Sequence, residues 1–326
     1  MKSGNGKSGG FAASAAVLGA GVLWGVINLF VRTLSAEGLS ALQISMVRMI
    51  VSAAVVWGGL LLLDRKHLRV RVRDLWMFAG TGIVSIVLFN VFYFDTMISG
   101  QASVAVVLLY TSPVFVMLLS ALLFRERITA RRFIALVLTV AGCAAVAGLF
   151  SSGNVSAGKI SAGSAAVISP RILLTGLASG LFYALYTIFG RVALRHYDSL
   201  TVTAYTFLFG TAGSVVFGHP IEAGRTFAAH PYLWGFGIGI GVICTVLPYF
   251  LYTWGLARMP SGKAAILVAV EPLVGAVLGM TVFGEDHSLP KLIGIALILA
   301  SILLLGTEKQ EPSGQIPSKN KEDKPT

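Results

Sequence analysis

The chain has 326 residues, of which 56% are hydrophobic and 12% are charged, and its mean hydropathy is +0.82. This composition excludes an ordinary soluble domain and indicates an integral membrane protein. The net charge of +11 does not indicate nucleic-acid binding, because the Lys and Arg residues gather in the short connections between long apolar runs.

Long apolar runs follow one another along almost the whole chain. Each is about 20 residues long, which is sufficient for a helix to cross a hydrocarbon layer ~30 Å thick. The first run is too long for the core of a signal peptide, so we interpret it as the first membrane helix. We therefore predict ten transmembrane helices, at residues 11–31, 41–63, 74–94, 101–124, 132–150, 171–190, 201–217, 232–255, 263–283 and 290–306.

The two halves of the chain align with each other at a fixed offset of 159 residues, without a gap. Chance matching of apolar residues does not explain the alignment, because small and charged residues also match. Examples are Gly21 with Gly180, Arg32 with Arg191, Pro113 with Pro272, and Glu126 with Glu285. Five helices per half is an odd number, so the second half enters the membrane in the opposite orientation. The predicted fold class is an all-α integral membrane protein with ten transmembrane helices in two inverted five-helix repeats.

The basic residues cluster on one predicted side of the membrane, after the runs 41–63 and 101–124. We predict a bacterial-type inner (plasma) membrane protein. By the positive-inside rule, both termini lie on the cytoplasmic side, where the basic loops also contact anionic lipid. The predicted organisation is a cytoplasmic N-terminal leader at 1–10, a first five-helix repeat at 11–150, a linker at 151–170, a second five-helix repeat at 171–306, and a disordered cytoplasmic tail at 307–326.

Glu271 is an ionisable residue near the middle of the run 263–283. A charge in hydrocarbon costs roughly 2.5–3.5 kcal/mol, so its presence there requires a reason. Pro272 follows it and leaves an upstream carbonyl without its helical donor. We expect Glu271 to bind a substrate amine or to carry a coupling proton. The alternative is that Glu271 has a structural role, in which its carboxyl group pairs with Arg48 or caps backbone groups that the helix break leaves without partners.

Arg48 is the second ionisable residue inside a predicted helix, and it shares a helical face with Ser45 and Ser52. It lies about two turns from the outer end of the run 41–63, so it either faces a cavity or extends outward to the interface. We therefore treat Arg48 as a coupling or structural charge.

Polar and aromatic residues form further stripes at helical spacing and are predicted to line a central cavity. For a Tyr or Trp residue near a helix end, the alternative is that it anchors the helix at the membrane interface. For one that lies deeper, the alternative is that it only packs against neighbouring helices. The candidate substrate-binding residues beside Glu271 are Trp24, Asn28, Asn90, Tyr93, Tyr110, Tyr183, Thr187, Tyr249 and Tyr252. Pro113, Pro248 and Pro272 interrupt helices and are predicted hinges.

No enzymatic site is indicated by the sequence. The two cysteines, Cys143 and Cys244, lie in separate runs, and no His and carboxylate residues stand at metal-ligand spacing. The stretch Gly6-Lys7-Ser8 lacks the first glycine of a phosphate-binding loop. We predict no enzyme activity, no cofactor and no metal.

These features together resemble the drug/metabolite transporter superfamily, and specifically its EamA-type members, over residues 11–306. The resemblance is carried by Trp24 in the small-residue first run, Arg48 in the second, the stretch Phe124-Arg125-Glu126-Arg127 after the proline-bearing fourth run, and the Glu271-Pro272 step. It implies a carrier of small metabolites, often an amino-acid exporter, that works by alternating access around a central cavity. Ser112 stands at the position that matches Glu271, which leaves no second carboxylate for a two-carboxylate proton scheme.

The leading hypothesis is a secondary transporter that exports small organic metabolites, amino acids or related compounds, with the proton as a candidate coupling ion. A second hypothesis is an uncoupled facilitator, whose solute movement would be saturable but insensitive to a pH gradient. A third is a non-transporting membrane scaffold. The polar stripes argue against a scaffold, because it has little reason to carry polar groups through the hydrocarbon layer.

Overall fold

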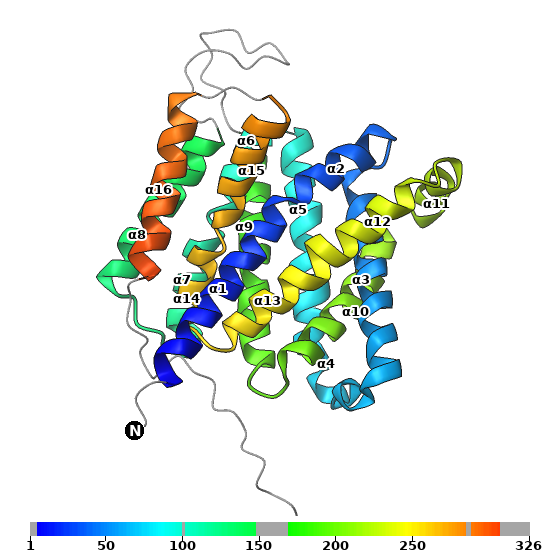
Figure 1. Cartoon of the computed structure of the whole chain (residues 1–326), viewed down its shortest axis with the longest axis horizontal. Coiled ribbons are helices and arrows are strands. Elements are labelled where there is room, and N and C mark those ends of the chain that lie inside the picture. Colours follow the sequence, from blue (N-terminus) through cyan, green and yellow to red (C-terminus); the bar gives the residue numbers. More distant parts are fainter. Residues whose placement is uncertain (1–4, 100–101, 148–168, 285–287, 307–326) are drawn as a thin grey trace, which may run out of the picture.

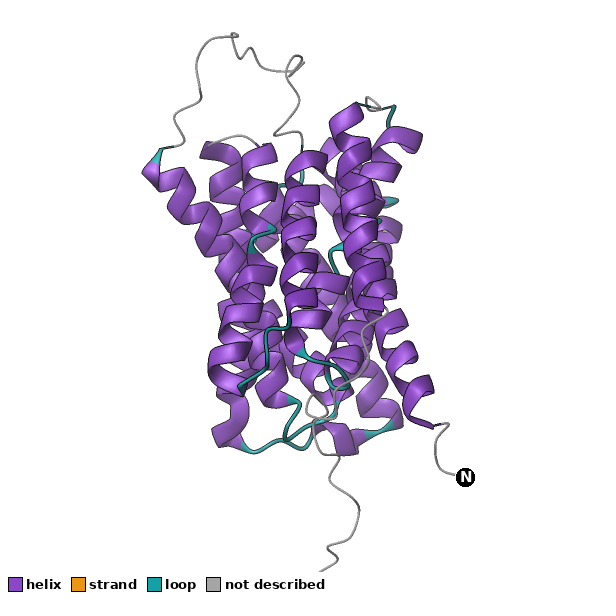
Figure 2. Ribbon diagram, turned by 90° about the vertical axis from the view of Figure 1, so that its left-hand side faces the viewer, coloured by secondary structure: helices purple, strands orange, loops and turns teal. Residues whose placement is uncertain are grey.

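The protein is a bundle of helices in the computed structural model, which describes residues 5–99, 102–147, 169–284 and 288–306. The helices pack side by side (Figures 1 and 2), and the described residues contain no β-strand. Nine helical stretches in these ranges are long and apolar enough to cross a membrane, namely Gly10–Ala36, Ala41–Leu63, Val72–Ser99, Val104–Phe124, Pro170–Ala193, Ser199–Phe217, Leu233–Leu256, Ser261–Val282 and Leu289–Gly306. The chain is therefore a multi-pass membrane protein.

The first half of the chain contains eight α-helices within the described residues. They are α1 (Asn5–Gly25), α2 (Ile27–Ala36), α3 (Ala41–Leu63), α4 (Leu75–Ala79), α5 (Leu88–Ser99), α6 (Ala102–Leu109), α7 (Ser112–Phe124) and α8 (Ala130–Val146). A π-helical segment, Gly80–Val87, joins α4 and α5 into one long stretch. Helix α3 begins with a capping box, in which the Ser40 side chain accepts from the Gln43 N–H and the Gln43 side chain accepts from the Ser40 N–H.

The second half also contains eight α-helices within the described residues. They are α9 (Pro170–Ala193), α10 (Ser199–Phe217), α11 (Pro220–Ala229), α12 (Leu233–Gly241), α13 (Leu247–Leu256), α14 (Ser261–Leu267), α15 (Val270–Val282) and α16 (Leu289–Gly306). A second π-helical segment, Val242–Val246, joins α12 and α13. Ser169 and Asp198 cap the N-termini of α9 and α10, because their side chains accept from N–H groups of the first turn.

The nine crossing stretches coincide with nine of the ten segments predicted from the sequence. The remaining segment, predicted at 132–150, is α8, which has 17 residues and is followed by residues outside the described ranges. Helix α11 was not predicted; it is short, begins at Pro220, and buries Phe227 against the bundle. Helix α1 begins at Asn5, so part of the predicted leader is helical. The predicted linker, apart from its last two residues, and the predicted tail lie outside the described residues.

Two of the long stretches are broken near their middle by a two-residue turn, and a one-residue turn at Val26 separates α1 from α2. Helix α6 gives way to α7 at Tyr110, and α14 gives way to α15 at Val268. Pro113 and Pro272 stand in the first turn after each break, where a missing N–H removes no helical hydrogen bond. The two breaks lie at nearly matching positions under the 159-residue offset, and the two π-helical segments overlap under the same offset.

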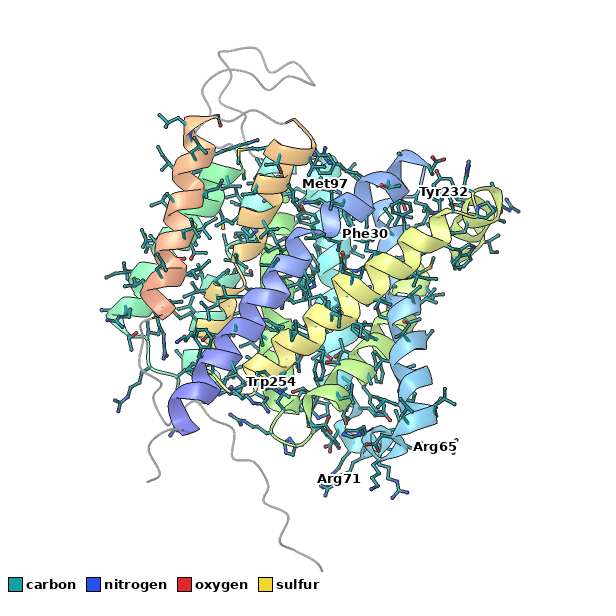
Figure 3. The ribbon with its side chains drawn as sticks, in the orientation of Figure 1. Phe30, Arg65, Arg71, Met97, Tyr232 and Trp254 are labelled. Atoms are coloured by element: carbon teal, nitrogen blue, oxygen red, sulfur yellow. The ribbon has the colours of Figure 1, made fainter. Side chains whose placement is uncertain are left out.

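The two ends of the bundle differ in charge. Arg65 and Arg71 project at one end, called here the basic end, whereas Met97 and Tyr232 lie at the opposite end, called the vestibule end (Figure 3). Helix α1 begins and α16 ends at the basic end (Figure 1). There the Tyr197 hydroxyl donates to Asp74 Oδ2 at 2.6 Å, which joins the start of α4 to the end of α9.

Helix α1 packs closely against α15, and a glycine makes this approach possible. A Cβ at Gly25 would lie 2.5 Å from the Val274 Cβ and 2.8 Å from the Glu271 carbonyl oxygen, so a larger residue does not fit without moving the helices apart. Close packing through small residues is characteristic of helix contacts in membranes. The contact places Trp24, the preceding residue, beside the break between α14 and α15.

Candidate functional site

A cavity enters the bundle from the vestibule end and reaches its middle. Its outer part, called here the vestibule, has a volume of about 530 Å³ and extends from Ser35 and Met97 to Glu271. Its inner part, the deep chamber, has a volume of about 90 Å³ and continues toward the basic end. The two parts adjoin at a junction, and the side chains that line both are Trp24, Ile27, Arg48, Phe89 and Glu271.

The vestibule is lined by polar side chains from several helices, among them α2, α3, α5 and α15. Asn28 is exposed in it, and Tyr93 and Tyr110 are partly exposed, so the space is accessible to a solute. Asn90 is buried, and its Nδ2 donates to the Ile86 carbonyl at 2.7 Å, which holds the amide against its own helix. The vestibule therefore offers both free and fixed polar groups.

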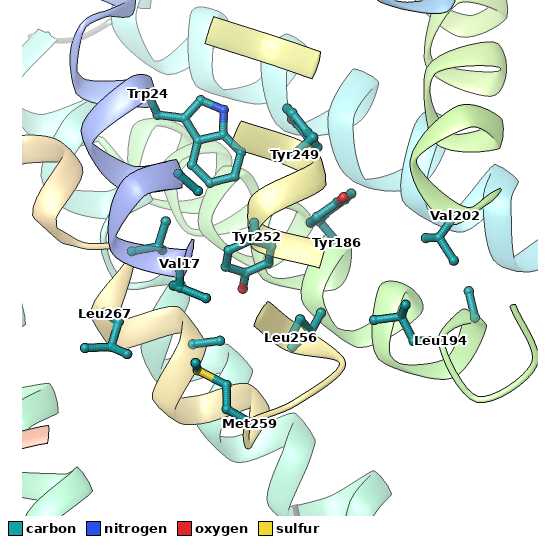
Figure 4. Close-up of a cluster of buried hydrophobic side chains, with 14 of the residues drawn as sticks. Val17, Trp24, Tyr186, Leu194, Val202, Tyr249, Tyr252, Leu256, Met259 and Leu267 are labelled. Carbon is teal, nitrogen blue, oxygen red and sulfur yellow. The ribbon is translucent and has the colours of Figure 1, made fainter. Parts of the chain in front are cut away.

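The deep chamber is lined largely by aromatic side chains from α9 and α13 (Figure 4). The Tyr249 ring centroid lies 5.1 Å from the centroids of both Trp24 and Tyr186, and both pairs meet edge to face. Thr187 Oγ1 lies 2.6 Å from Tyr252 Oη, so these two buried hydroxyls satisfy each other. Edge-to-face packing and paired hydroxyls together hold the rings in defined orientations.

Glu271 lies at the junction, in the first turn of α15. The Glu271 N–H donates to the Val268 carbonyl at 3.0 Å across the break before this helix, and the positive end of the helix dipole favours the negative charge of the carboxylate. Tyr183 Oη donates to Glu271 Oε2 at 3.5 Å, which is long for a hydrogen bond. The carboxylate is partly exposed to the cavity and is available to a solute that enters from the vestibule.

Arg48 reaches the same junction from α3. Its side chain is buried inside the bundle, with 9% of the residue exposed, and does not extend to the surface. The guanidinium neighbours the Tyr249 hydroxyl. Among the described residues, no ion pair within 4.0 Å joins Arg48 to Glu271. The junction therefore carries two opposite charges that the chain does not join directly.

The deep chamber ends toward the basic end in a layer of buried polar contacts, called here the closure network (Glu126, Arg191 and Ser261). Arg191 Nη1 donates to the Leu256 and Met259 carbonyl oxygens, at 2.6 and 2.8 Å. Arg191 Nη2 lies 3.9 Å from Glu126 Oε1, and this oxygen accepts from the N–H and the hydroxyl of Ser261, at 3.0 and 2.9 Å. These contacts join the ends of α7, α9 and α13 to the start of α14 and close the cavity at the basic end.

All the candidate substrate-binding residues predicted from the sequence line this cavity. Trp24 and Glu271 lie at the junction, Asn28, Asn90, Tyr93 and Tyr110 line the vestibule, and Tyr183, Thr187, Tyr249 and Tyr252 line the deep chamber. Of the predicted hinges, Pro272 lines the vestibule, Pro113 is the second residue of α7, and Pro248 is the second residue of α13, directly after a π-helical segment.

Phe89 and the closure network were not predicted from the sequence as parts of the site. A phenylalanine inside an apolar run carries no signal of its own. Glu126 and Arg191 carried one signal, because the repeat offset matches each with a residue of the same type in the other half. A match within one sequence does not show which residues meet, since that depends on how α7, α9 and α14 pack together.

The described side chains of the cavity can recognise a solute by charge, hydrogen bonding and aromatic contact. Cys143 and Cys244 are buried free thiols. Within the described ranges, no group of three or more His, Cys, Asp or Glu side chains could hold a metal ion. What the cavity presents to a solute is the Glu271 carboxylate, the cationic side chains of Arg32, Arg48 and Lys291, amides, hydroxyls and aromatic rings.

Comparison with known proteins points to transport. The model of the EamA-like transporter family matches the chain twice, over residues 12–148 and 170–307. An uncharacterized transporter of Archaeoglobus fulgidus is 26% identical over 298 residues, which cover 90% of this chain and 96% of that protein. The uncharacterized transporter YetK of Bacillus subtilis is 21% identical over 302 residues, which cover 92% of this chain and 87% of YetK. The uncharacterized inner membrane transporter YicL of Salmonella typhimurium is 31% identical over 143 residues, which cover 44% and 47% of the two chains.

A solved crystal structure of another protein has a similar fold. The two structures superpose with a TM-score of 0.69 and 17% sequence identity, over 90% of this chain and 95% of that chain. At this identity the likeness supports the fold alone. The family match and the names of the relatives indicate a transporter, which is not an enzyme.

Proposed function

The chain belongs to the EamA-like transporter family, and from this premise we propose that it is a secondary transporter that exports small organic metabolites, amino acids or related compounds, by alternating access around the central cavity. The observation that carries the proposal is the course of the cavity. It enters from one end, reaches a partly exposed carboxylate at a helix break, and stops at the closure network. A carrier that binds a solute at mid-depth and exposes it to one side at a time requires this arrangement.

The proposed architecture is two inverted five-helix repeats, at 11–150 and 171–306, with α8 as the fifth membrane helix. Two separate matches to the family model support it, as do the breaks and π-helical segments that correspond between the halves. With the basic end in the cytoplasm, as the positive-inside rule requires, both termini are cytoplasmic and the protein lies in the plasma membrane. In this orientation the cavity is open to the outside.

The inward-facing conformation then requires the closure network to separate and the vestibule to close. The breaks before α7 and α15 and the π-helical segments are points at which the long stretches can bend, because the regular backbone hydrogen bonding is interrupted there. Pro113, Pro248 and Pro272 are the proposed hinge residues, since each follows one of these interruptions.

Glu271 is the proposed centre of recognition, where it binds a substrate amine or carries a coupling proton. We test this by reconstituting the full chain in liposomes and measuring counterflow of labelled amino acids and other small metabolites, with and without a pH gradient. Glu271→Gln should reduce the rate at least about tenfold, because the amide neither pairs with an amine nor exchanges a proton. Glu222→Gln, on the exposed surface of α11, is the matched control and should keep the wild-type rate.

The outcomes separate the hypotheses. Saturable movement that the gradient drives and that Glu271→Gln abolishes supports a proton-coupled carrier. Saturable movement that is indifferent to the gradient favours an uncoupled facilitator. If Glu271→Gln moves solutes at the wild-type rate, the Glu271 carboxylate has no role in the mechanism. If no solute of the panel moves in the wild-type protein, the proposal of transport is contradicted.

A further inference from the structure

Two polar groups on α3 have no partner within the described residues. Arg48 Nε and Ser45 Oγ are both buried, and neither makes a hydrogen bond there. Ser45 lies one helical turn before Arg48, and both residues line the vestibule. A buried donor without an acceptor is costly, more so when it is charged, so the two groups require an acceptor that the described chain does not supply.

We propose that Arg48 and Ser45 form an anion subsite, and that the solute is a zwitterion whose carboxylate binds this subsite while its ammonium group binds Glu271. The inference rests on the proposed function, because it places a transported solute at the junction. It goes further by naming the charge pattern that the solute must carry.

The placement of the two charges supports a ligand between them. Arg48 and Glu271 line both the vestibule and the deep chamber, so they flank one space. If Arg48 served only to neutralise Glu271, a direct ion pair would satisfy both groups, and none within 4.0 Å joins them in the described structure. A zwitterion at the junction pairs each charge with its opposite and leaves the site neutral. The hydroxyls of Tyr183 and Tyr249, beside the two charges, complete its polar surroundings.

The same arrangement discriminates against solutes with a single charge. An amine without a carboxylate would pair with Glu271 and leave the buried guanidinium unpaired. A carboxylate without an amine would leave Glu271 unpaired. An uncompensated charge in a site of low dielectric is strongly unfavourable, so selectivity arises from the penalty on the wrong solute as much as from contacts to the right one.

The test uses solutes that differ by one charge. Each amino acid of the counterflow panel is measured beside its amide and its deaminated acid, for example L-leucine beside L-leucinamide and 4-methylpentanoate. The full chain in liposomes is compared with Arg48→Gln, Arg48→Lys and the double variant Arg48→Gln with Glu271→Gln. Arg225→Gln, on the exposed surface of α11, is the matched control.

We expect Arg48→Gln to raise the half-saturating concentration of the amino acid at least about tenfold while binding of the amide stays equal or strengthens. This crossover is the signature of a carboxylate subsite, since a purely structural arginine would weaken both probes alike. Arg48→Lys keeps the charge balance with Glu271, so it folds even if the glutamine variant does not, and it should retain only part of the preference because it lacks the Nε donor. The double variant should not recover the wild-type half-saturating concentration for the amino acid.

Three results would overturn the inference. Equal transport of the amino acid, its amide and its deaminated acid by the wild-type protein would leave the transport function intact and refute the requirement for a zwitterion. An equal shift in the half-saturating concentrations of all three probes in Arg48→Gln or Arg48→Lys would show that the role of the arginine is structural. Failure of every probe to move in the wild-type protein would refute the proposed function itself, and this inference with it.

Discussion

At the scale of single residues, the walls of the deep chamber depend on polar groups that satisfy one another. The hydrogen bond between Thr187 and Tyr252 is buried and short, at 2.6 Å. Thr187→Val keeps the shape of the side chain but leaves the Tyr252 hydroxyl without this partner, and we expect a loss of stability of about 1–3 kcal/mol. The loss of stability is measured by comparing the thermal unfolding of the variant and the wild-type protein in detergent.

The double variant with Tyr252→Phe provides the control. It removes both polar groups, so it should be less destabilised than the sum of the two single variants. Strict additivity would show that the two hydroxyls do not depend on each other.

The residues of the candidate site could be found largely from the sequence, because a polar or aromatic side chain deep in an apolar helix stands out. Asn28, Tyr110 and Glu271 were predicted in this way, and all three line the cavity. Which groups are left without partners could not be predicted. The free donors of Arg48 and Ser45 depend on distances between helices, and helical spacing within one chain does not fix those distances.

At the scale of elements, the contact between α8 and α16 shows how small residues hold two helices together. A Cβ at Gly142 would lie 2.9 Å from the Gly294 carbonyl oxygen, and Thr139 Oγ1 donates to Ser301 Oγ at 2.9 Å across the same interface. Gly142→Leu should therefore separate the helices and lower stability by about 1–3 kcal/mol.

The thermal midpoint in detergent tests this prediction. Gly59→Leu is the matched control, because an added Cβ at Gly59 meets no atom within 4 Å. Equal midpoints for the two variants would mean that the contact between α8 and α16 contributes nothing to stability.

Elements with clear end signals were predicted best. Helix α3 was predicted at 41–63 and observed at those residues, since Ser40 caps its start and a charged stretch follows its end. Helix α11 was missed, because a ten-residue amphipathic stretch at the end of a bundle lacks the long apolar run by which the membrane helices were found. The prolines indicated that helices are interrupted, but the π-helical segments have no comparable sequence signal.

At the scale of the whole molecule, the cavity is open at one end and closed at the other. The vestibule separates parts of α2, α5 and α15, whereas the closure network ties together the other ends of α7, α9, α13 and α14. The central claim is that these two regions open in alternation. Breaking the closure network should therefore shift the population toward the conformation that is open at the basic end.

Reciprocal accessibility of two cysteines tests this claim most directly. Gly275 lines the vestibule with room for a side chain, and Ala265 lines the deep chamber. Each is replaced by Cys in a chain whose two native cysteines are replaced by Ala, and a membrane-impermeant maleimide is applied from one side at a time. Glu126→Ala then removes the acceptor of Ser261 and the partner of Arg191.

We predict that Glu126→Ala raises labelling of Ala265→Cys from the basic end at least about tenfold and lowers labelling of Gly275→Cys from the vestibule end, because one population grows at the expense of the other. An increase at both positions would indicate an open pore, and unchanged labelling at both would contradict alternating access through this cavity.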